Sequence, residues 1–283
     1  MLKKIVAFSL AFALILGVYT PQVNFAEEGF GKKDKIDEEV YNSKKEVQLA
    51  KKLQKMSEKE IKKDQKFFLN QINKLTDPEF DRFMYNFVKD NYQSVQEMTE
   101  NLKLLDVEFS MIEEKDKNKV SIASLTSTSD MDLTIYASKR GGQAWYNLQS
   151  IWLTGSEESP GTYDVVSVEW DPTFSEFYDA AVGTGVSKKD GSKRLSGSYL
   201  FNVEDDDDFD SYAVVRVIPK KSSGRFHYGT KYSHTYATVE TAVTGTATIS
   251  WSATGPTGGA SYGVTLSQGN AAWDLWDDNW TNF

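Results

Sequence analysis

The chain has no cysteine, only two histidines among 283 residues, and no apolar run long enough to span a bilayer. The absence of cysteine excludes disulfide bonds, thiolate metal sites, cysteine nucleophiles and a lipid attached to a cysteine. The two histidines, His227 and His234, cannot form a zinc site unless acidic residues complete it. No P-loop, dinucleotide-binding fingerprint, kinase motif, HExxH motif or nucleophile-elbow serine is present. The sequence therefore predicts no organic cofactor and favours a protein that is not an enzyme.

Positive charge is also scarce. Asp and Glu outnumber Lys and Arg, 41 to 32, which gives a formal net charge of −9 at pH 7. An acidic chain repels phosphate backbones, so we expect no nucleic-acid partner. The acidic excess is concentrated after residue 120, in the part that also holds all seven tryptophans. This difference in composition suggests two structural units.

The N-terminus has the features of an export signal. Lys3 and Lys4 precede an uncharged run, Ile5–Val18, which is shorter than the ~20 residues that a spanning helix needs. Pro21 and Ala26 follow, and we predict a signal peptide at residues 1–26 that is cleaved after Ala26. The alternative is an uncleaved membrane anchor. With the lack of cysteine, this signal predicts a secreted, extracellular protein of a bacterium.

Residues 27–118 carry helical spacing in a Lys/Glu-rich background. Apolar residues recur every three, four or seven positions between Val40 and Leu105. Ser57–Glu60 has the pattern of a capping box, and Asp77 is predicted to be the N-cap of a second helix. We expect a helical hairpin that packs its apolar stripe internally; a pro-segment or a partner-binding coiled coil is the alternative.

Residues 119–283 have the alternation typical of antiparallel strands. Strands are predicted at Leu133–Ala137, Val166–Trp170 and Leu195–Val203, and the apolar run Tyr212–Ile218 predicts a central strand. The fold class is therefore α+β: an N-terminal helical hairpin followed by an antiparallel β-sandwich of about eight strands.

The longest alternating segment lies near the end of the chain. Thr238–Thr254 places apolar residues on one face and mostly Thr and Ser on the other. Gly255–Gly259 predicts a loop, so residues 238–267 are expected to form a β-hairpin. By contrast, the aromatic residues of Phe174–Tyr178 suggest a short helical turn.

Two clusters are candidates for binding. Asp206, Asp208 and Asp210 lie in a dense acidic segment, where Ca²⁺ would relieve the repulsion between carboxylates; the alternative is a solvated loop. Trp273, Trp276 and Trp280 have the spacing of one helical face. That face either docks on the domain or forms an aromatic platform for sugars or lipid headgroups.

We expect a secreted, non-enzymatic binding or interaction protein. Its partners would be a glycan, the cell wall or the surface of a target cell. Two alternatives remain open. The first is a secreted β-pore-forming toxin that inserts the 238–267 hairpin into a membrane. The second is an extracellular hydrolase with paired carboxylates, because the pairing of carboxylates is spatial and a sequence does not exclude it.

Overall fold

The structure combines helices with antiparallel sheets. The computed structural model describes residues 38–89, 91–112, 120–121, 131–154, 163–190, 192–204, 210–235, 251–252, 255–256 and 272–282. The predicted signal peptide and most of the predicted hairpin lie outside these residues. The described residues all belong to one contact unit, Ile36–Phe283, and the α+β class is confirmed.

Six short helices occupy the first part of the described chain, so the prediction of a helical hairpin is wrong. The apolar stripe is divided among helices of at most 12 residues. No helix in this part of the chain is long and apolar enough to cross a membrane. The helices are α1 Glu38–Ser43, α2 Lys45–Leu53, α3 Glu58–Lys63, α4 Gln65–Asn73, α5 Asp77–Val88 and α6 Val95–Lys103.

Capping boxes determine where α3, α5 and α6 begin. Ser57 is the N-cap of α3 as predicted, and its backbone N–H donates to the Glu60 carboxylate at 2.8 Å. The N-cap of α5 is Thr76, not Asp77, because the Thr76 N–H donates to the Glu79 carboxylate at 2.7 Å. Asp77 is thereby the first helical residue, and its carboxylate is available for a contact with sheet residues described below.

The apolar stripe breaks between α5 and α6. Lys89 leaves the helical conformation with ψ of 131°, and Ser94 begins α6 with a further capping box. Gln54, at the end of α2, donates its side-chain amide to the carbonyl oxygens of Asn86 and Lys89 at 2.9 and 2.8 Å. The exposed carbonyl groups at the end of α5 are therefore satisfied without a continuation of the helix.

The strands form two large antiparallel sheets. Sheet A has the order β1-β3-β4-β9-β6, and sheet B has the order β2-β13-β10-β5-β8-β7. The central strand predicted at Tyr212–Ile218 is confirmed as β9, which pairs on both sides. The described strands are β1 Val107–Ser110, β2 Val120–Ser121, β3 Met131–Arg140, β4 Tyr146–Thr154, β5 Tyr163–Trp170, β6 Ser175–Val182, β7 Val186–Lys188, β8 Ser198–Glu204, β9 Ser211–Pro219, β10 Arg225–Thr235, β11 Trp251–Ser252, β12 Gly255–Pro256 and β13 Ala272–Asn282.

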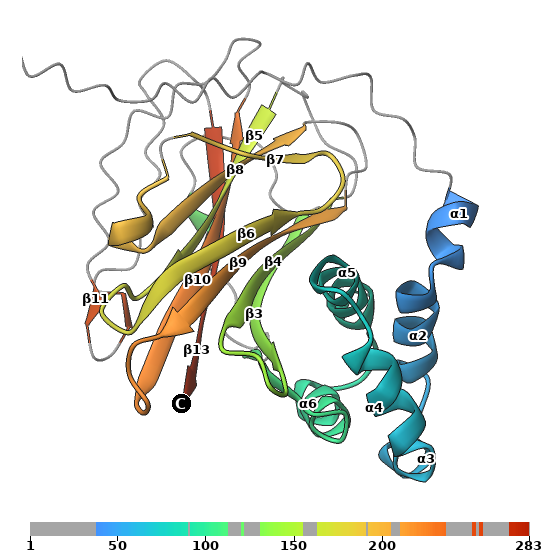
Figure 1. Cartoon of the computed structure of the whole chain (residues 1–283). Helices are drawn as coiled ribbons and strands as arrows, with labels where there is room; N and C mark the ends of the chain where they lie inside the picture. Colours follow the sequence, from blue (N-terminus) through green and yellow to red (C-terminus); the bar gives the residue numbers. More distant parts are fainter. Residues whose placement is uncertain are drawn as a thin grey trace, which may run out of the picture. The chain divides into compact units, whose positions relative to one another are not determined.

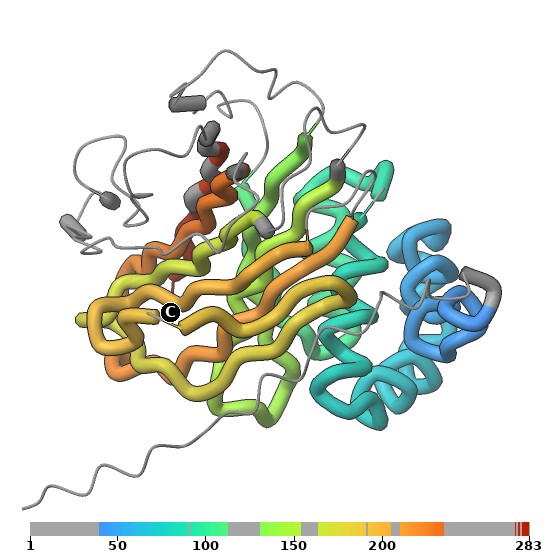
Figure 2. The backbone as a smooth tube through the Cα atoms, turned by 90° about the horizontal axis from the view of Figure 1, so that it is seen from above, coloured from blue at the N-terminus to red at the C-terminus, as the bar shows by residue number. Residues whose placement is uncertain are grey.

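Two hydrophobic clusters order the helices and sheets into layers. One cluster joins the sheets, with buried residues such as Leu148 of sheet A and Phe201 of sheet B. The other joins the helices to the opposite side of sheet A, with residues such as Phe83, Ile151 and Tyr212. Figures 1 and 2 show the helices gathered on one side of the strands, beside β3 and β4. Sheet A thus lies between the helices and sheet B.

Two segments differ from their predicted local structure. The predicted helical turn at Phe174–Tyr178 lies mostly in β6, which pairs with β9. The pairing of Ser252 with Gly255 places Gly255 and Pro256 in a strand and not in the predicted loop. In both segments, hydrogen bonds to a neighbouring strand outweigh the local preference of the sequence.

Side chains of β13 form hydrogen bonds with backbone groups along one edge of β3. The Ile135 backbone N–H donates to Asp277 Oδ2 at 2.9 Å, and the Asn279 amide donates to the Ile135 carbonyl oxygen at 3.2 Å. The two side chains replace the hydrogen bonds that a neighbouring strand would make. They also fix β13 of sheet B against sheet A.

Candidate functional site

The predicted calcium ligands are only partly described. Asp206 and Asp208 lie outside the described residues, whereas Asp210 forms an ion pair with Lys89 at the end of α5. That ammonium group already offsets the charge of one of the three carboxylates. No group of three or more acidic or histidine side chains within the described ranges could hold a metal ion. The calcium site stays a prediction.

The tryptophans predicted to bind a ligand lie on a strand, so their placement on one helical face is wrong. β13 pairs with β10 from Ala272 to Asn282 and thus gains a continuous ladder of backbone hydrogen bonds. Successive positions of a strand alternate between its two faces. Positions 276 and 280 of β13 therefore share a face, and position 273 belongs to the other.

Trp276 and Trp280 belong to the side of sheet B that faces away from the shared core. The core residues of β10, such as Tyr228 and Tyr232, have even numbers, so its odd-numbered residues lie on the other side. We call this side the polar face of sheet B. It comprises Ser167 and Glu169 of β5, His227, Gly229 and Lys231 of β10, and Trp276, Asp278 and Trp280 of β13.

The register arranges these residues in rows across the sheet. The central row has Gly229 between two acidic residues, one on each neighbouring strand. The flanking rows each combine a cationic or titratable residue of β10 with a tryptophan of β13. The three rows are Ser167, Lys231 and Trp276; Glu169, Gly229 and Asp278; and His227 with Trp280.

Three titratable side chains of this face are buried. The exposed fraction is 0% for Glu169, 6% for His227 and 8% for Lys231. The Ser167 hydroxyl donates to Glu169 Oε1 at 2.9 Å. Charged side chains seldom lose contact with water unless they are held by partners, and both hydrophobic clusters lie elsewhere. The burial therefore marks a place where charged groups are held in fixed positions, as they are in binding sites.

The core side of the same strands holds a second histidine. His234 Nδ1 lies 3.1 Å from Asp164 Oδ2, and the Tyr232 hydroxyl donates to the same oxygen at 2.5 Å. His234 and Asp164 are 0% exposed. Position 273 of β13 is the register partner of His234. The carboxylate fixes the imidazole between the sheets, which is a structural arrangement.

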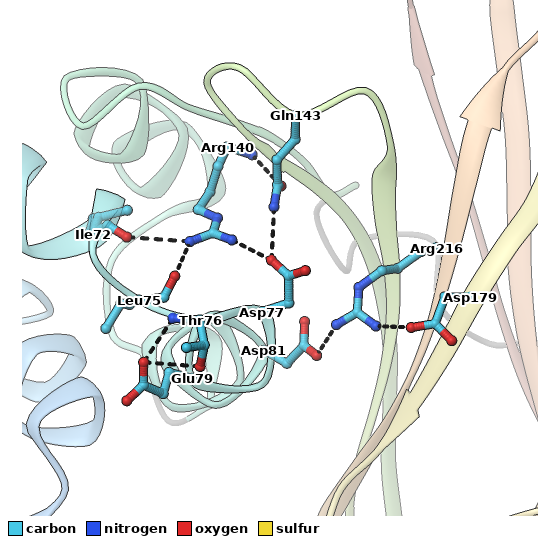
Figure 3. A network of polar contacts seen from close by, with 10 residues as sticks. All are labelled: Ile72, Leu75, Thr76, Asp77, Glu79, Asp81, Arg140, Gln143, Asp179 and Arg216. Carbon is cyan, nitrogen blue, oxygen red and sulfur yellow. Dashed lines mark hydrogen bonds and ion pairs between the residues drawn. The ribbon is translucent and has the colours of Figure 1, made fainter.

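Another polar cluster joins α5 to sheet A (Figure 3). The Arg216 guanidinium of β9 donates to Asp81 of α5 at 2.5 Å and to Asp179 of β6 at 2.9 Å. The Arg140 guanidinium of β3 donates to Asp77 at 2.5 Å and to backbone carbonyl groups between α4 and α5. The first turns of α5 are therefore tied to β3 and β9 of sheet A.

Burial controls the ionisation of this cluster. Loss of solvation raises the pKa of Asp81 from 3.8 to about 7, although Arg216 favours the charged form. Burial also lowers the pKa of Arg140 and raises the pKa of the Tyr136 hydroxyl. Asp81 is only 1% exposed, so a substrate in solution does not reach it. The cluster is a joint between helices and sheet.

Two of these buried residues could have been recognised in the sequence, because each is a charged residue within an apolar segment. Arg216 interrupts the otherwise apolar run of β9, and Asp81 lies among the phenylalanines of α5. A charged residue within an apolar segment indicates a buried partner. Glu169 gives no such signal, because it occupies a polar position of an ordinary alternating strand. Comparison of the chain with models of known protein families and with curated protein sequences found no match.

Proposed function

We propose that this is a secreted, non-enzymatic, extracellular binding protein of a bacterium. In this proposal the two sheets form a β-sandwich scaffold that presents the polar face of sheet B to a glycan of a cell wall or cell surface. The export features of residues 1–26 and the absence of any recognisable catalytic motif support this function.

The register of β13 is the observation that carries the proposal. It assigns positions 276 and 280 of β13 to the same face as Glu169, His227 and Lys231. The two tryptophans are four residues apart on one strand, which corresponds to roughly 13 Å. This separation suits an extended ligand and not a single small molecule.

The mixture of side chains on this face favours a sugar over other ligands. Sugar rings offer an apolar face to indoles, and their hydroxyl groups bind polar side chains. Trp280 is a partly exposed residue of this face, whereas Glu169, His227 and Lys231 lie buried beside it. Acidic and basic residues alternate across the face, so neither a polyanion nor a polycation gains a uniform attraction. The Arg225 guanidinium lies 4.3 Å from the centre of the Trp280 ring and restrains that indole.

The test is a pull-down of the full mature chain on cell-wall fragments and immobilised neutral glycans. Replacement of both Trp276 and Trp280 by Ala should weaken binding about tenfold or more, because each lost aromatic contact costs ~0.5–1.5 kcal/mol. Tyr92→Ala is the matched control, since Tyr92 is a fully exposed aromatic residue on the helical side. Trp276→Phe retains a flat ring and should bind better than Trp276→Ala.

Equal binding by the wild type and the double Ala variant would exclude this face as the binding site. Failure of the wild type to bind any cell-wall or glycan probe would contradict the proposed function itself. Thermal melts of each variant separate a loss of contact from a loss of folding.

The second candidate function is a hydrolase with paired carboxylates. The register of the central row supports it, although Glu169 is 0% exposed and would have to become accessible to substrate. Glu169 and Asp278 lie on strands that are separated by β10, so their backbones are roughly 10 Å apart. Inverting glycosidases hold their two carboxyl groups ~6.5–9.5 Å apart. A hydrolase predicts release of reducing sugar from polysaccharide and its loss in both Glu169→Gln and Asp278→Asn. No release by the wild type from any polysaccharide that it binds would leave the binding function alone.

A further inference from the structure

A stacked pair of aromatic rings, one partly buried and one exposed, lies beside β6 of sheet A, apart from the polar face of sheet B. The rings of Trp145 and Tyr178 stack with their centroids 5.0 Å apart and their planes at 27°. Tyr178 remains 51% exposed in spite of this contact. Contact of a large aromatic side chain with water is unfavourable, so the exposure of Tyr178 needs a reason.

A β-bulge produces the pair. The register between β6 and β9 shifts between Phe177 and Asp179, so Tyr178 has no register partner. Phe177 packs against the core between the sheets, whereas Asp179 contacts Arg216 on the helix-facing side. The extra residue therefore emerges beside Asp179 and contacts Trp145, which precedes β4. Bulges commonly redirect side chains in this way next to functional sites.

The polar groups beside the pair are held in place and are nearly balanced in charge. Asp179 accepts a hydrogen bond from Arg216, whose other amino group binds Asp81, and Figure 3 shows this arrangement. Lys188 lies 4.0 Å from the same Asp179 carboxylate. The Asp179 side chain is nevertheless 52% exposed, so it can accept further hydrogen bonds from a ligand. Glu176, also exposed, is the nearest acidic residue along β6.

We propose that Trp145, Tyr178 and Asp179 form a second saccharide-binding site, which takes a neutral sugar ring. The ring stacks on the exposed side of Tyr178, and its hydroxyl groups donate to the Asp179 carboxylate. Rigid aromatic side chains bind a flat apolar surface with little loss of entropy, and the Arg216 contact removes the cost of ordering the acid.

The balance of charge around Asp179 favours a neutral sugar over a cationic headgroup and over an anionic lipid surface. A cationic headgroup would need net negative charge beside the rings, but two cations already neutralise Asp179. An anionic lipid surface would need a cluster of exposed basic residues, whereas Arg216 is only 3% exposed and Lys188 lies beside the Asp179 carboxylate. A neutral, hydroxyl-rich ligand does not depend on either charge.

The site lies on the side of sheet A that faces away from sheet B, and the polar face lies on the side of sheet B that faces away from sheet A. A glycan chain bound to one site therefore leaves the other site available for a second chain. If both sites bind, the protein links two polysaccharide chains, and this part of the inference rests on the proposed function. The site at Tyr178 itself does not depend on it.

The experiment measures the affinity of the full mature chain for soluble neutral polysaccharides by affinity electrophoresis, with xylan, mixed-linkage glucan and chitin oligosaccharides as probes. Tyr178→Ala should weaken binding of at least one probe about tenfold. Tyr178→Phe keeps the ring and should change affinity less than threefold, and Tyr92→Ala serves as the exposed-tyrosine control. Asp179→Asn should weaken the same probe without a change in the melting temperature larger than that of Tyr178→Ala.

Three results would overturn the inference. One is equal affinity of wild type and Tyr178→Ala for every probe, and another is no binding of any probe by the wild type. The third is loss of binding in Tyr178→Ala only towards phosphatidylcholine or phosphatidylglycerol vesicles, which would assign the site to lipid. Combined replacement of Trp276 and Trp280 distinguishes the two sites. If that variant loses binding while Tyr178→Ala keeps it, the proposed function stands and the second site fails.

Discussion

At the scale of single residues, the most informative group is the Asp81 carboxyl. It is buried against Arg216, and Asp77, Arg140, Tyr136 and Tyr212 also lie in its electrostatic surroundings. A buried carboxyl that is paired with only one cation still prefers its neutral form, because desolvation exceeds the attraction between the two charges. The joint between α5 and sheet A therefore depends on the protonation of one residue.

This predicts a pH dependence of stability that is opposite to that of a surface salt bridge. The pKa of Asp81 rises from 3.8 in the unfolded chain to about 7 in the folded protein, so the folded state binds the proton more tightly. The stabilisation by this proton is complete below about pH 4 and is lost as the pH rises through about 7. Between these limits, the contribution of Asp81 to the free energy of unfolding should fall by up to about 1.4 kcal/mol per pH unit.

Urea unfolding at pH 5 and pH 7.5, for the wild type and for Asp81→Asn, checks this prediction. The amide cannot ionise, so the difference in stability between the two proteins isolates the titration of Asp81 from that of its neighbours. We expect the wild type to lose more stability than the variant between these two pH values. The same loss in both proteins would show that the carboxyl titrates in its ordinary range.

At the scale of secondary-structure elements, the sequence predicted local features well, but it predicted poorly which strands pair with each other. The α3 capping box at Ser57 and the central strand β9 depend on neighbouring residues, and both are confirmed. The predicted helical face of Trp273–Trp280 is wrong because its residues pair with β10, which is distant in the sequence and was not itself predicted. A spacing of three and four residues is compatible with a strand once a partner supplies the hydrogen bonds.

The dependence on strand pairing also explains how much of the candidate sites could be predicted from the sequence. The tryptophans of β13 were visible as a cluster, but their division between two faces follows from a strand register that only the fold provides. Glu169 and Gly229 had no reason to be associated before β5 and β10 were seen to pair. The Trp145–Tyr178 pair also needs the bulge in β6, where the sequence suggested a helical turn.

At the scale of the whole molecule, the question is whether the helices and sheets unfold together. The sequence suggested a division near residue 118, whereas one hydrophobic cluster contains residues of both α5 and sheet A. Arg140 of β3 strengthens this connection, because it binds Asp77 and lies 4.7 Å from the ring of Phe80. All seven tryptophans follow the helices in the chain, so tryptophan fluorescence reports the sheets and circular dichroism at 222 nm reports mainly the helices.

We therefore expect the two signals to change together in urea, as they do in a two-state transition. Arg140→Met should lower the urea midpoint of both signals equally, with a loss of about 2 kcal/mol in the free energy of unfolding. The substitution removes the charged hydrogen bond between Arg140 and Asp77, which is partly exposed. Lys62→Ala is the control, since its ion pair with Glu58 is exposed and should contribute less than about 0.5 kcal/mol. If the helical signal disappears at a lower urea concentration than the fluorescence signal, the helices form a separate unit. In that case Arg140→Met would shift the helical transition and leave the fluorescence transition unchanged.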